Sequence, residues 1–443
     1  MTKTSNLTQK QIFWFWLPLA AMWLMMAVEQ PSLTAMVSRL PEATKNLAAF
    51  GMTFSFALLV ESPVIMLLTA CTALTTHQQA YRRLLHFTHI LTFTFTALHV
   101  LLAVTPLYPY ILREWVGAPV EIIETSHMAF LLMTPWTPGI AYRRFWQGVM
   151  IRYGHPQRVT LVVVARLIAT ITVLLVGFGL GRWAGAYVAA VALSVGVSVA
   201  AVAAWLFALP TIRQEIPEMS TQDDALEWKP LITFYIPLAL TSLISIASQP
   251  ILAFGLSRAP MPLESLAIWP VMMGLLFIGR SMALACQEVV VALLKDAQSY
   301  AMLRTFVWRL AISTSAFFVL LALTPGVTFW YRYISGLTPE LAQLAILPTI
   351  IMAIIPGINA FISWYRGVLV HNQHTTPISI AVALNMGTLL ILMSIFPYVA
   401  NVAGAVLAAA ALTASLVVES LFLWWQSRLS VAKTELAEVA LGD

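Results

Sequence analysis

Two ionisable residues, Glu61 and Arg280, lie in the middle of long apolar stretches of this sequence. An ionisable side chain at the centre of a membrane-spanning helix costs about 2.5–3.5 kcal/mol on insertion scales, so it is a candidate for function by default. An arginine can hold a carboxylate or a phosphate with two parallel hydrogen bonds, and a glutamate shielded from water can carry a proton. The two residues therefore predict either an ion pair that latches two parts of the chain, or an anion ligand and a proton site or gate.

The apolar stretches hold further candidates of both kinds. Arg166 is a second candidate anion ligand, and two arginines in one cleft would favour an anionic substrate. Four neutral side chains complete the predicted substrate-binding set: Gln30, Gln249, Asn359 and Asn385. Three acidic side chains join Glu61 as candidates for ion coupling or gating: Glu29, Glu288 and Glu419. Glu29 could equally stabilise a helix kink beside it, and Glu288 could be a solvated charge at the end of its span.

The composition indicates that these residues belong to a membrane protein. The chain has 443 residues, of which 60% are apolar and 10% charged, and its mean hydropathy is +0.84. Ordinary soluble domains carry roughly 25% charged residues. A membrane-spanning helix needs about 20 mostly apolar residues. Twelve stretches meet this requirement: 12–36, 47–76, 84–108, 119–142, 158–180, 183–210, 230–256, 264–294, 304–329, 338–364, 377–399 and 401–426.

Charge and motifs argue against several other classes of protein. The net charge of +5 is spread over short loops without a basic patch, so we expect no nucleic-acid partner. The two cysteines, both in apolar stretches, form no disulfide framework or metal motif. The sequence contains no phosphate-binding glycine loop, zinc-protease motif or hydrolase elbow, so we expect neither an enzyme nor a cofactor or metal site.

The second half of the sequence repeats the first at a fixed offset of 219 residues. The segment EQPSLTAMVSRLP at 29–41 returns as SQPILAFGLSRAP at 248–260, and VLLAVTP at 100–106 returns as VLLALTP at 319–325. Apolar matches alone would be common in a membrane protein, but Pro, Gly, Arg and Tyr also match at this offset. The sequence therefore predicts an internal duplication, in which Glu61 is equivalent to Arg280.

The duplication predicts the domain organisation. The longest polar stretch, 211–229, is expected to be a cytoplasmic linker between two six-helix bundles, 1–210 and 230–443. Because six is an even number of spans, both bundles insert with the same orientation. The predicted fold class is an all-α membrane protein with twelve transmembrane helices in two like-oriented six-helix bundles. The offset also makes Arg166 equivalent to Asn385.

The distribution of Lys and Arg predicts the orientation of the chain. If the N-terminus is cytoplasmic, fifteen of the 24 Lys and Arg residues fall in cytoplasmic loops and six on the opposite side. The fifteen include Arg143, Arg144 and Arg366. Cytoplasmic loops carry the excess of Lys and Arg in membrane proteins. We therefore expect both termini in the cytoplasm and a location in an inner or plasma membrane.

Each half contains a Gln-Pro step deep in its first predicted helix. Pro31 and Pro250 each remove one backbone hydrogen bond and are expected to kink their helices. Gln30 and Gln249 lie beside these kinks. The two steps could serve only to shape the helices, or they could line a cleft where they flex or bind a ligand.

The arrangement of two repeated halves resembles the fold of the multidrug-and-toxin-extrusion (MATE) transporters and their wider flippase superfamily. More narrowly, PLA at 18–20, EQ at 29–30 and LAAFG at 47–51 resemble the first helix and loop of the progressive ankylosis protein family. PLAL at 237–240, SQPI at 248–251 and ES at 419–420 also resemble that family. The resemblance implies export of anions such as pyrophosphate, nucleotides or citrate-like carboxylates.

The sequence thus predicts a secondary active transporter that exports small organic or phosphate-type anions by alternating access of two bundles. The expected partners are a small anionic substrate, membrane lipid, and a proton or sodium ion for coupling, and the expected state is a monomer. Two alternatives of the same fold stay open: a cation-coupled multidrug antiporter and a flippase for a lipid-linked precursor.

Overall fold

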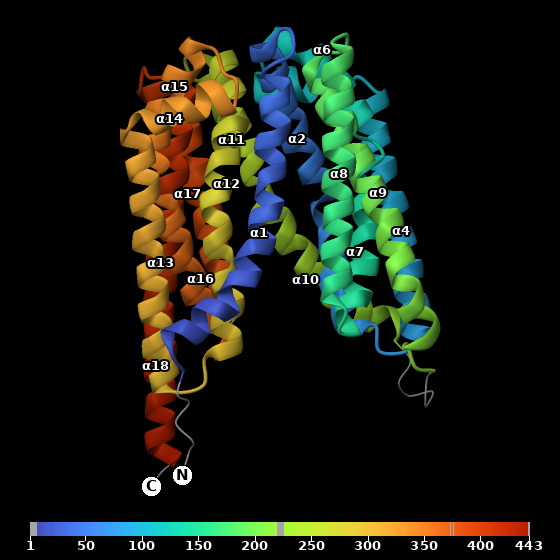
Figure 1. Ribbon diagram of the computed structural model, residues 1–443, viewed down its shortest axis with the longest axis vertical. Helices are drawn as coiled ribbons and strands as arrows, with labels where there is room; N and C mark the ends of the chain where they lie inside the picture. Colours follow the sequence, from blue (N-terminus) through green and yellow to red (C-terminus); the bar gives the residue numbers. More distant parts are fainter. Residues whose placement is uncertain (1–6, 219–225, 373, 375, 442–443) are drawn as a thin grey trace. The chain divides into compact units, whose positions relative to one another are not determined.

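The structure is a computed structural model that describes residues 7–218, 226–372, 374 and 376–441, and every regular element among them is a helix (Figure 1). The first half of the chain forms α1 (Gln9–Val37), α2 (Ala43–Ile65), α3 (Leu67–Leu74), α4 (Gln78–Val104), α5 (Leu107–Tyr110), the π-helix η1 (Ile111–Val116), α6 (Val120–Leu132), α7 (Trp136–Arg152), α8 (Pro156–Leu180) and α9 (Gly185–Gln214). The second half forms α10 (Trp228–Ile246), α11 (Ser248–Arg258), α12 (Pro262–Leu293), α13 (Ala297–Leu323), α14 (Pro325–Phe329), the π-helix η3 (Trp330–Ile334), α15 (Pro339–Met352), α16 (Ile355–His371), α17 (Thr376–Val399) and α18 (Gly404–Leu441). The predicted all-α fold class is confirmed.

The backbone repeats at the same offset of 219 residues as the sequence. Helices α4 and α13 begin and end at equivalent residues, and so do α7 and α16. Gly117 directly follows η1, and Gly336 lies two residues after the end of η3; their φ angles are 74° and 73°. Glu42 and Met261, which precede α2 and α12, have φ angles of 51° and 54°. A positive φ is uncommon outside glycine, so its recurrence at equivalent residues supports the duplication independently of sequence identity.

The contacts of the chain define two compact units. Unit 1 comprises Met1–Ala35, Ala259–Met261 and Ile268–Asp443, and unit 2 comprises Met36–Arg258 and Pro262–Ala267. These units differ from the predicted bundles 1–210 and 230–443. Most of α1 groups with the helices of the second half, and α10 and α11 group with the helices of the first half.

Side-chain packing explains why α1 belongs to unit 1. Ile12, Trp16 and Ala20 lie in one hydrophobic core with side chains of α12, α13 and α16. The indole Nε1 of Trp16 also donates a hydrogen bond of 3.0 Å to the carbonyl oxygen of Met282. Close van der Waals packing and interhelical hydrogen bonds of this kind are what hold membrane helices together.

Helix α10 is fixed in unit 2 at a break between α2 and α3. Pro63 has no backbone N–H, and the hydroxyl of Ser62 donates instead to the carbonyl oxygen of Leu59 (2.8 Å). Two side chains of α10 then satisfy the carbonyl groups that the helix end exposes. The Tyr235 hydroxyl donates to Pro63 (2.6 Å), and the Ser242 hydroxyl donates to Ser62 (2.8 Å).

Eleven helical segments in the described part of the chain are long and apolar enough to cross a membrane. The remaining predicted span, 119–142, is the fourth along the chain, and it is built as two helices, α6 and α7, that have 13 and 17 residues. Its equivalent in the second half, α15 with α16, is one of the eleven segments. The difference has a chemical cause, because α7 carries Arg143 and Arg144 and is the less apolar copy.

The two Gln-Pro steps differ in structure. Helix α1 continues without interruption through Pro31. In the second half, the chain breaks at Ala247 between α10 and α11, three residues before Pro250. The same sequence step is therefore compatible with a continuous helix in one half and with two helices in the other.

Candidate functional site

Unit 2 contains a buried group of charged side chains around Glu61, which we call the unit 2 cluster. Glu61 lies on α2 and exposes only 1% of its surface. Its carboxylate interacts electrostatically with Arg143 and Arg144 of α7 and with Arg166 of α8. Among the residues that the structure describes, its Oε2 atom has no hydrogen-bond partner. The unit 2 cluster therefore combines three arginines with one carboxylate.

Local structure explains how these four residues come together. Glu61 lies two residues before Pro63, near the end of α2, where the chain is held by the hydrogen bonds from α10. Arg143 and Arg144 occupy the middle of α7, which packs against α2. Arg144 also interacts electrostatically with Arg166. Like charges repel each other, so this pair adds to the positive potential of the unit 2 cluster.

Unit 1 contains a second buried group of charges around Glu419, which we call the unit 1 cluster. Glu419 lies on α18 and exposes 3% of its surface. Arg366 of α16 donates from Nη2 to Glu419 Oε1, and Asn385 of α17 donates from Nδ2 to Oε2 at 2.7 Å. Arg280 of α12 interacts electrostatically with Glu419 and with Arg366. Both oxygens of this carboxylate are thus engaged by side chains.

The two clusters occupy equivalent places in the duplicated chain. The residues at 280, 366, 385 and 419 of unit 1 correspond, at the offset of 219, to Glu61, Gln147, Arg166 and Ala200 of unit 2. Gln147 is buried on α7, one turn after Arg143. The two halves thus build a polar interior at the same place, although the residue at each position has changed.

Glu61 and Arg280 find charged partners within their own units. Glu61 belongs to the unit 2 cluster, and Arg280 belongs to the unit 1 cluster. Of the other predicted residues, Arg166 joins Glu61, and Asn385 joins Glu419.

Four of the other predicted site residues, Asn359, Gln30, Gln249 and Glu288, are not members of either cluster. Asn359 is buried on α16, but its Nδ2 donates to Ile355 of the same helix at 2.9 Å. Gln30, Glu29 and Gln249 are partly exposed, and Glu288 is exposed on α12. Their predicted roles in binding and coupling stay predictions.

Three cluster residues were missed because they had been assigned to cytoplasmic loops. Arg143, Arg144 and Arg366 instead lie inside α7 and α16, and Arg143 exposes only 2% of its surface. Spans predicted from hydropathy end where charged residues begin, so the predicted spans 119–142 and 338–364 stop before these three arginines. The repeat could have indicated that the helix continues past Arg366, because Gly367 and Val368 match Gly148 and Val149 at the offset of 219. Without the three, the bias of Lys and Arg becomes twelve against six and keeps its direction.

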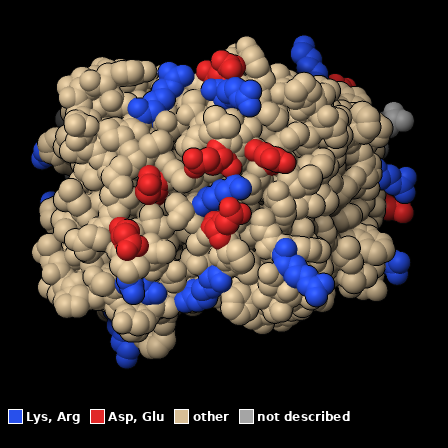
Figure 2. Space-filling view, turned by 90° about the horizontal axis from the view of Figure 1, so that it is seen from above, with Lys and Arg blue, Asp and Glu red and all other residues tan. Residues whose placement is uncertain are grey.

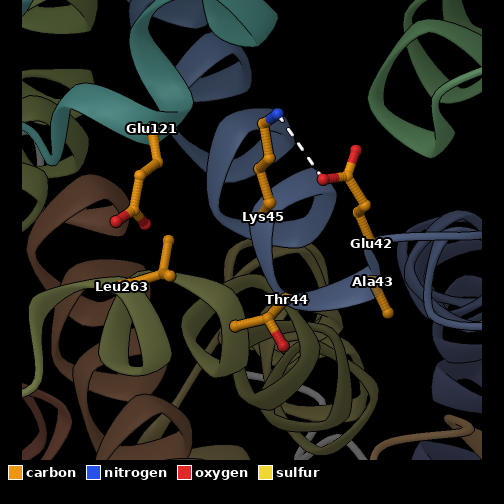
Figure 3. Close-up of a pocket in the computed structure, with 6 residues that line it drawn as sticks. All are labelled: Glu42, Ala43, Thr44, Lys45, Glu121 and Leu263. Atoms are coloured by element: carbon orange, nitrogen blue, oxygen red, sulfur yellow. Dashed lines mark ion pairs between the residues drawn. The ribbon is translucent and has the colours of Figure 1, made fainter.

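Acidic and basic side chains lie near one another on the face of the molecule that Figure 2 shows, and uncharged residues cover most of that face. A pocket of about 470 Å³ opens in unit 2 at the start of α2 (Figure 3). It is lined by Glu42, Ala43, Thr44, Lys45, Glu121 and Leu263. Lys45 already pairs with Glu42 at 3.7 Å, so this pocket has no surplus positive charge for an anion.

The arginines of the clusters have chemistry that suits the binding of anions. Buried guanidinium groups can hold carboxylates or phosphates through paired hydrogen bonds. Among the described residues, no group of three or more His, Cys, Asp or Glu side chains is placed to hold a metal ion.

Comparison with solved structures defines the fold class of the chain. An inward-facing multidrug resistance MATE family transporter of the MOP superfamily superposes with a TM-score of 0.73 and 16% identity, over 94% of this chain and 99% of that one. The lipid II flippase MurJ, in an inward closed conformation, gives 0.69 and 12% identity over 93% of this chain and 87% of that one. A MOP superfamily transporter from Pyrococcus furiosus gives 0.63 and 15% identity over 96% and 97%. The chain has the MATE-like fold.

No protein-family model and no curated protein matches this sequence. The fold implied by the sequence resemblance is confirmed, and the narrower resemblance to the progressive ankylosis protein family stays a prediction. With its apolar helices and this fold, the chain is a multi-pass membrane protein. The orientation of its termini and the membrane in which it resides also stay predictions.

Proposed function

We propose that this protein is a secondary active transporter that exports small organic or phosphate-type anions of the citrate or dicarboxylate, pyrophosphate or nucleotide class. The observation that carries the proposal is the surplus of arginine in both buried clusters. Three arginines interact electrostatically with Glu61, Arg280 interacts electrostatically with Glu419, and Arg366 forms an ion pair with Glu419. Both clusters contain more guanidinium groups than carboxylates, and the resulting positive potential would attract an anion.

The fold supports transport over catalysis. Its neighbours are described as a multidrug resistance transporter, a lipid II flippase and a transporter with a binding pocket of reverse polarity that suggests a different function. Transport would follow from alternating access of the two units. We propose a monomer in an inner or plasma membrane with both termini in the cytoplasm.

The same clusters supply candidates for ion coupling. Glu61 has a carboxylate oxygen with no hydrogen-bond partner among the described residues, so it can take up a proton without breaking a side-chain hydrogen bond of that atom. Glu419 would have to break its bonds to Arg366 and Asn385 to do the same. We therefore propose Glu61 ahead of Glu419 as the proton site.

The test is uptake by the purified full-length protein in liposomes. Radiolabelled citrate, succinate, pyrophosphate, ATP and an organic cation would be compared with and without a proton or sodium gradient. We expect uptake of at least one anion, its loss in Arg280→Ala and Arg144→Ala, and its retention in Arg309→Ala, which alters an arginine outside both clusters. Transport of the organic cation alone would refute the anion proposal.

A cation-coupled multidrug antiporter is the second candidate function, because a multidrug resistance MATE family transporter has this fold. It predicts cation transport that survives Arg280→Ala and fails in Glu61→Gln. A flippase for a lipid-linked precursor is a third candidate, because MurJ also has this fold. It predicts movement of a labelled lipid between leaflets by a protein that moves none of the soluble compounds.

A further inference from the structure

The first helix of each repeat packs on helices of the other repeat. Helix α1 belongs by sequence to the first repeat, and α10 belongs to the second. Ile12 and Trp16 of α1 lie in a hydrophobic core with side chains of α12, α13 and α16. Leu231 and Tyr235 of α10 lie in a core with side chains of α3, α4 and α7. The two pairs are equivalent at the offset of 219, so the exchange of first helices between the repeats is reciprocal.

The surfaces that receive the two helices are equivalent as well. In unit 1 the surface is formed by α12, α13 and α16. In unit 2 it is formed by α4 and α7 together with α2 and α3, which correspond to α12. Matched core residues line both surfaces, and three of the pairs are Leu303 with Leu84, Phe306 with Phe87, and Val368 with Val149. Each repeat therefore carries the same docking surface and binds the first helix of the other repeat there.

Each docked helix also donates a matched hydrogen bond to its surface. The indole Nε1 of Trp16 donates to the carbonyl oxygen of Met282 at 3.0 Å, and the hydroxyl of Tyr235 donates to that of Pro63 at 2.6 Å. Met282 and Pro63 are equivalent, as are Trp16 and Tyr235. A tryptophan and a tyrosine thus reach the same backbone carbonyl with different donor groups. Interhelical hydrogen bonds of this kind hold membrane helices together, because lipid offers a polar group no other partner.

The rings of these two side chains make a further matched contact. Trp16 meets Phe306 edge to face, with ring centroids 5.8 Å apart, and Tyr235 meets Phe87 in the same arrangement at 4.9 Å. Edge-to-face pairs at this separation are favourable beyond the area that they bury. The hydrogen bond and the ring contact are both directional, so a shift of either helix along its surface would break both. Each first helix is therefore fixed in register on the other repeat.

Short segments connect each first helix to the rest of its own repeat. Residues 38–42 join α1 to α2, and residues 259–261 join α11, which follows α10, to α12. The boundaries between the two units lie within or close to these segments. The last residues of the segments, Glu42 and Met261, have φ angles of 51° and 54°. Hinges are a few loop residues that absorb changes in φ and ψ, so these segments are where the chain can bend without disturbing either docking surface.

We propose that each first helix moves with the unit on which it docks, and that residues 38–42 and 259–261 are the hinges of this motion. Helix α1 then moves with the second repeat, and α10 moves with the first. Undocking would break a hydrogen bond and an aromatic contact and would separate two packed surfaces, whereas bending at the hinges keeps all of these contacts. The existence of the motion rests on the proposed function, but the assignment of each helix to a unit rests on its contacts.

The test measures distances between pairs of nitroxide labels by electron paramagnetic resonance on the full-length protein in lipid nanodiscs. Trp14 of α1 and Thr233 of α10 are equivalent, and so are Phe93 of α4 and Ile312 of α13; all four side chains are exposed. Each would be replaced by cysteine and labelled. The docking pairs are Trp14→Cys with Ile312→Cys, and Thr233→Cys with Phe93→Cys. The repeat pairs are Trp14→Cys with Phe93→Cys, and Thr233→Cys with Ile312→Cys.

The conditions are chosen to populate more than one state of the protein. Both native cysteines are buried, so wild-type protein taken through the labelling reaction serves as the control for background. Spectra would be recorded at acidic and neutral pH, with sodium or choline as the cation, and with and without citrate or pyrophosphate. We expect both docking pairs to keep their distances within about 2 Å in every condition and at least one repeat pair to change by more than this, because domain rearrangements exceed about 2 Å.

A change in either docking pair would overturn the proposal, because that helix would then move apart from the unit on which it docks. Four constant distances would overturn it as well. If a labelled variant does not fold, the exposed and equivalent residues Lys10 and Lys229 offer alternative label positions on α1 and α10. Trp16→Phe keeps an aromatic ring and removes the N–H donor, and we expect it to broaden the distance distribution of the unit 1 docking pair alone. Tyr235→Phe should do so in unit 2 alone, and the opposite pattern would overturn the proposal.

The outcomes for this inference and for the proposed function are separate. Constant docking pairs with a changing repeat pair, in a protein that transports no anion into liposomes, would refute the proposed function and leave the inference standing. Anion uptake by a protein whose docking pairs change would refute the inference and leave the function standing.

Discussion

Removal of Arg366 tests whether the unit 1 cluster stabilises the fold. The variant Arg366→Ala leaves Glu419 buried, with 3% of its surface exposed, and without its ion pair. Breaking a buried pair by removing one partner costs about 3–5 kcal/mol in free energy of unfolding. Asn385 still donates to this carboxylate, and Arg280 still lies within electrostatic range, so we expect the lower end of that range.

Two controls separate the loss of charge from the loss of volume. Gln147→Ala truncates the equivalent buried side chain of unit 2, which carries no charge. We expect this variant to lower the free energy of unfolding by about 1–3 kcal/mol at most, which is the cost of leaving a buried hydrogen-bonding group without its partner. The double variant Arg366→Met with Glu419→Gln removes both charges, and we expect it to recover much of the stability, because replacing both partners of a buried pair is often neutral.

The assay is unfolding of the full-length protein in mixed micelles with increasing SDS, followed by circular dichroism and tryptophan fluorescence. The informative quantity is the coupling free energy between Arg366 and Glu419 in the double-mutant cycle of wild type, the single variants Arg366→Met and Glu419→Gln, and the double variant that carries both. If Arg366→Ala unfolds within 1 kcal/mol of wild type, the pair contributes little and the reasoning is wrong. It is equally wrong if the double variant loses as much stability as the two single variants added together.

Three further predictions concern helix packing and pH. Gly148→Ala and Gly367→Ala should each destabilise the protein by about 1–3 kcal/mol in the same SDS assay, because the added Cβ would lie 2.6 Å from Cys71 Cβ or 2.7 Å from Val290 Cβ. Gly179→Ala should stabilise α8 by about 0.5–1 kcal/mol, because no atom lies within 4 Å of its added Cβ; a loss of stability there would contradict the packing of α8. The hydrogen bond from His155 lowers the pKa of Glu215. The stability from this contact is therefore present above the ordinary pKa of 4.5, and it is lost as the pH falls through the lowered pKa. Thermal unfolding between pH 3 and 6 should show this loss in wild type and not in Glu215→Gln.

Composition and the repeat were sufficient to predict the all-α membrane fold. The surplus of apolar residues required lipid-embedded helices, and the 219-residue offset required two copies of one arrangement. The structure extends this agreement to the backbone, since Glu42 and Met261 share a left-handed conformation at equivalent positions. The agreement between the repeated sequence and the repeated backbone could be predicted, because proline, glycine and apolar residues that form turns and spans recur at the same offset.

The membership of the two units could not be predicted from local signals. Helix α1 belongs to unit 1 because Trp16 and its neighbours pack against helices more than 250 residues away in the sequence. The same limit applies to the clusters. The sequence identified Glu61 and Arg280 as unusual, but their charged neighbours lie on other helices, and hydropathy had assigned several of those neighbours to loops.

The exchange of residues between equivalent positions bears on what the clusters do. If the buried charges served stability alone, each unit would be expected to balance its charges with side chains of its own. Unit 1 comes near to this, because both oxygens of Glu419 accept hydrogen bonds. Unit 2 keeps the polar interior, carries more arginine, and has Ala200 where the second carboxylate would stand. The duplication therefore keeps buried charge at equivalent positions in both units while the numbers of arginines and carboxylates change, and the packing of the helices alone does not require this exchange.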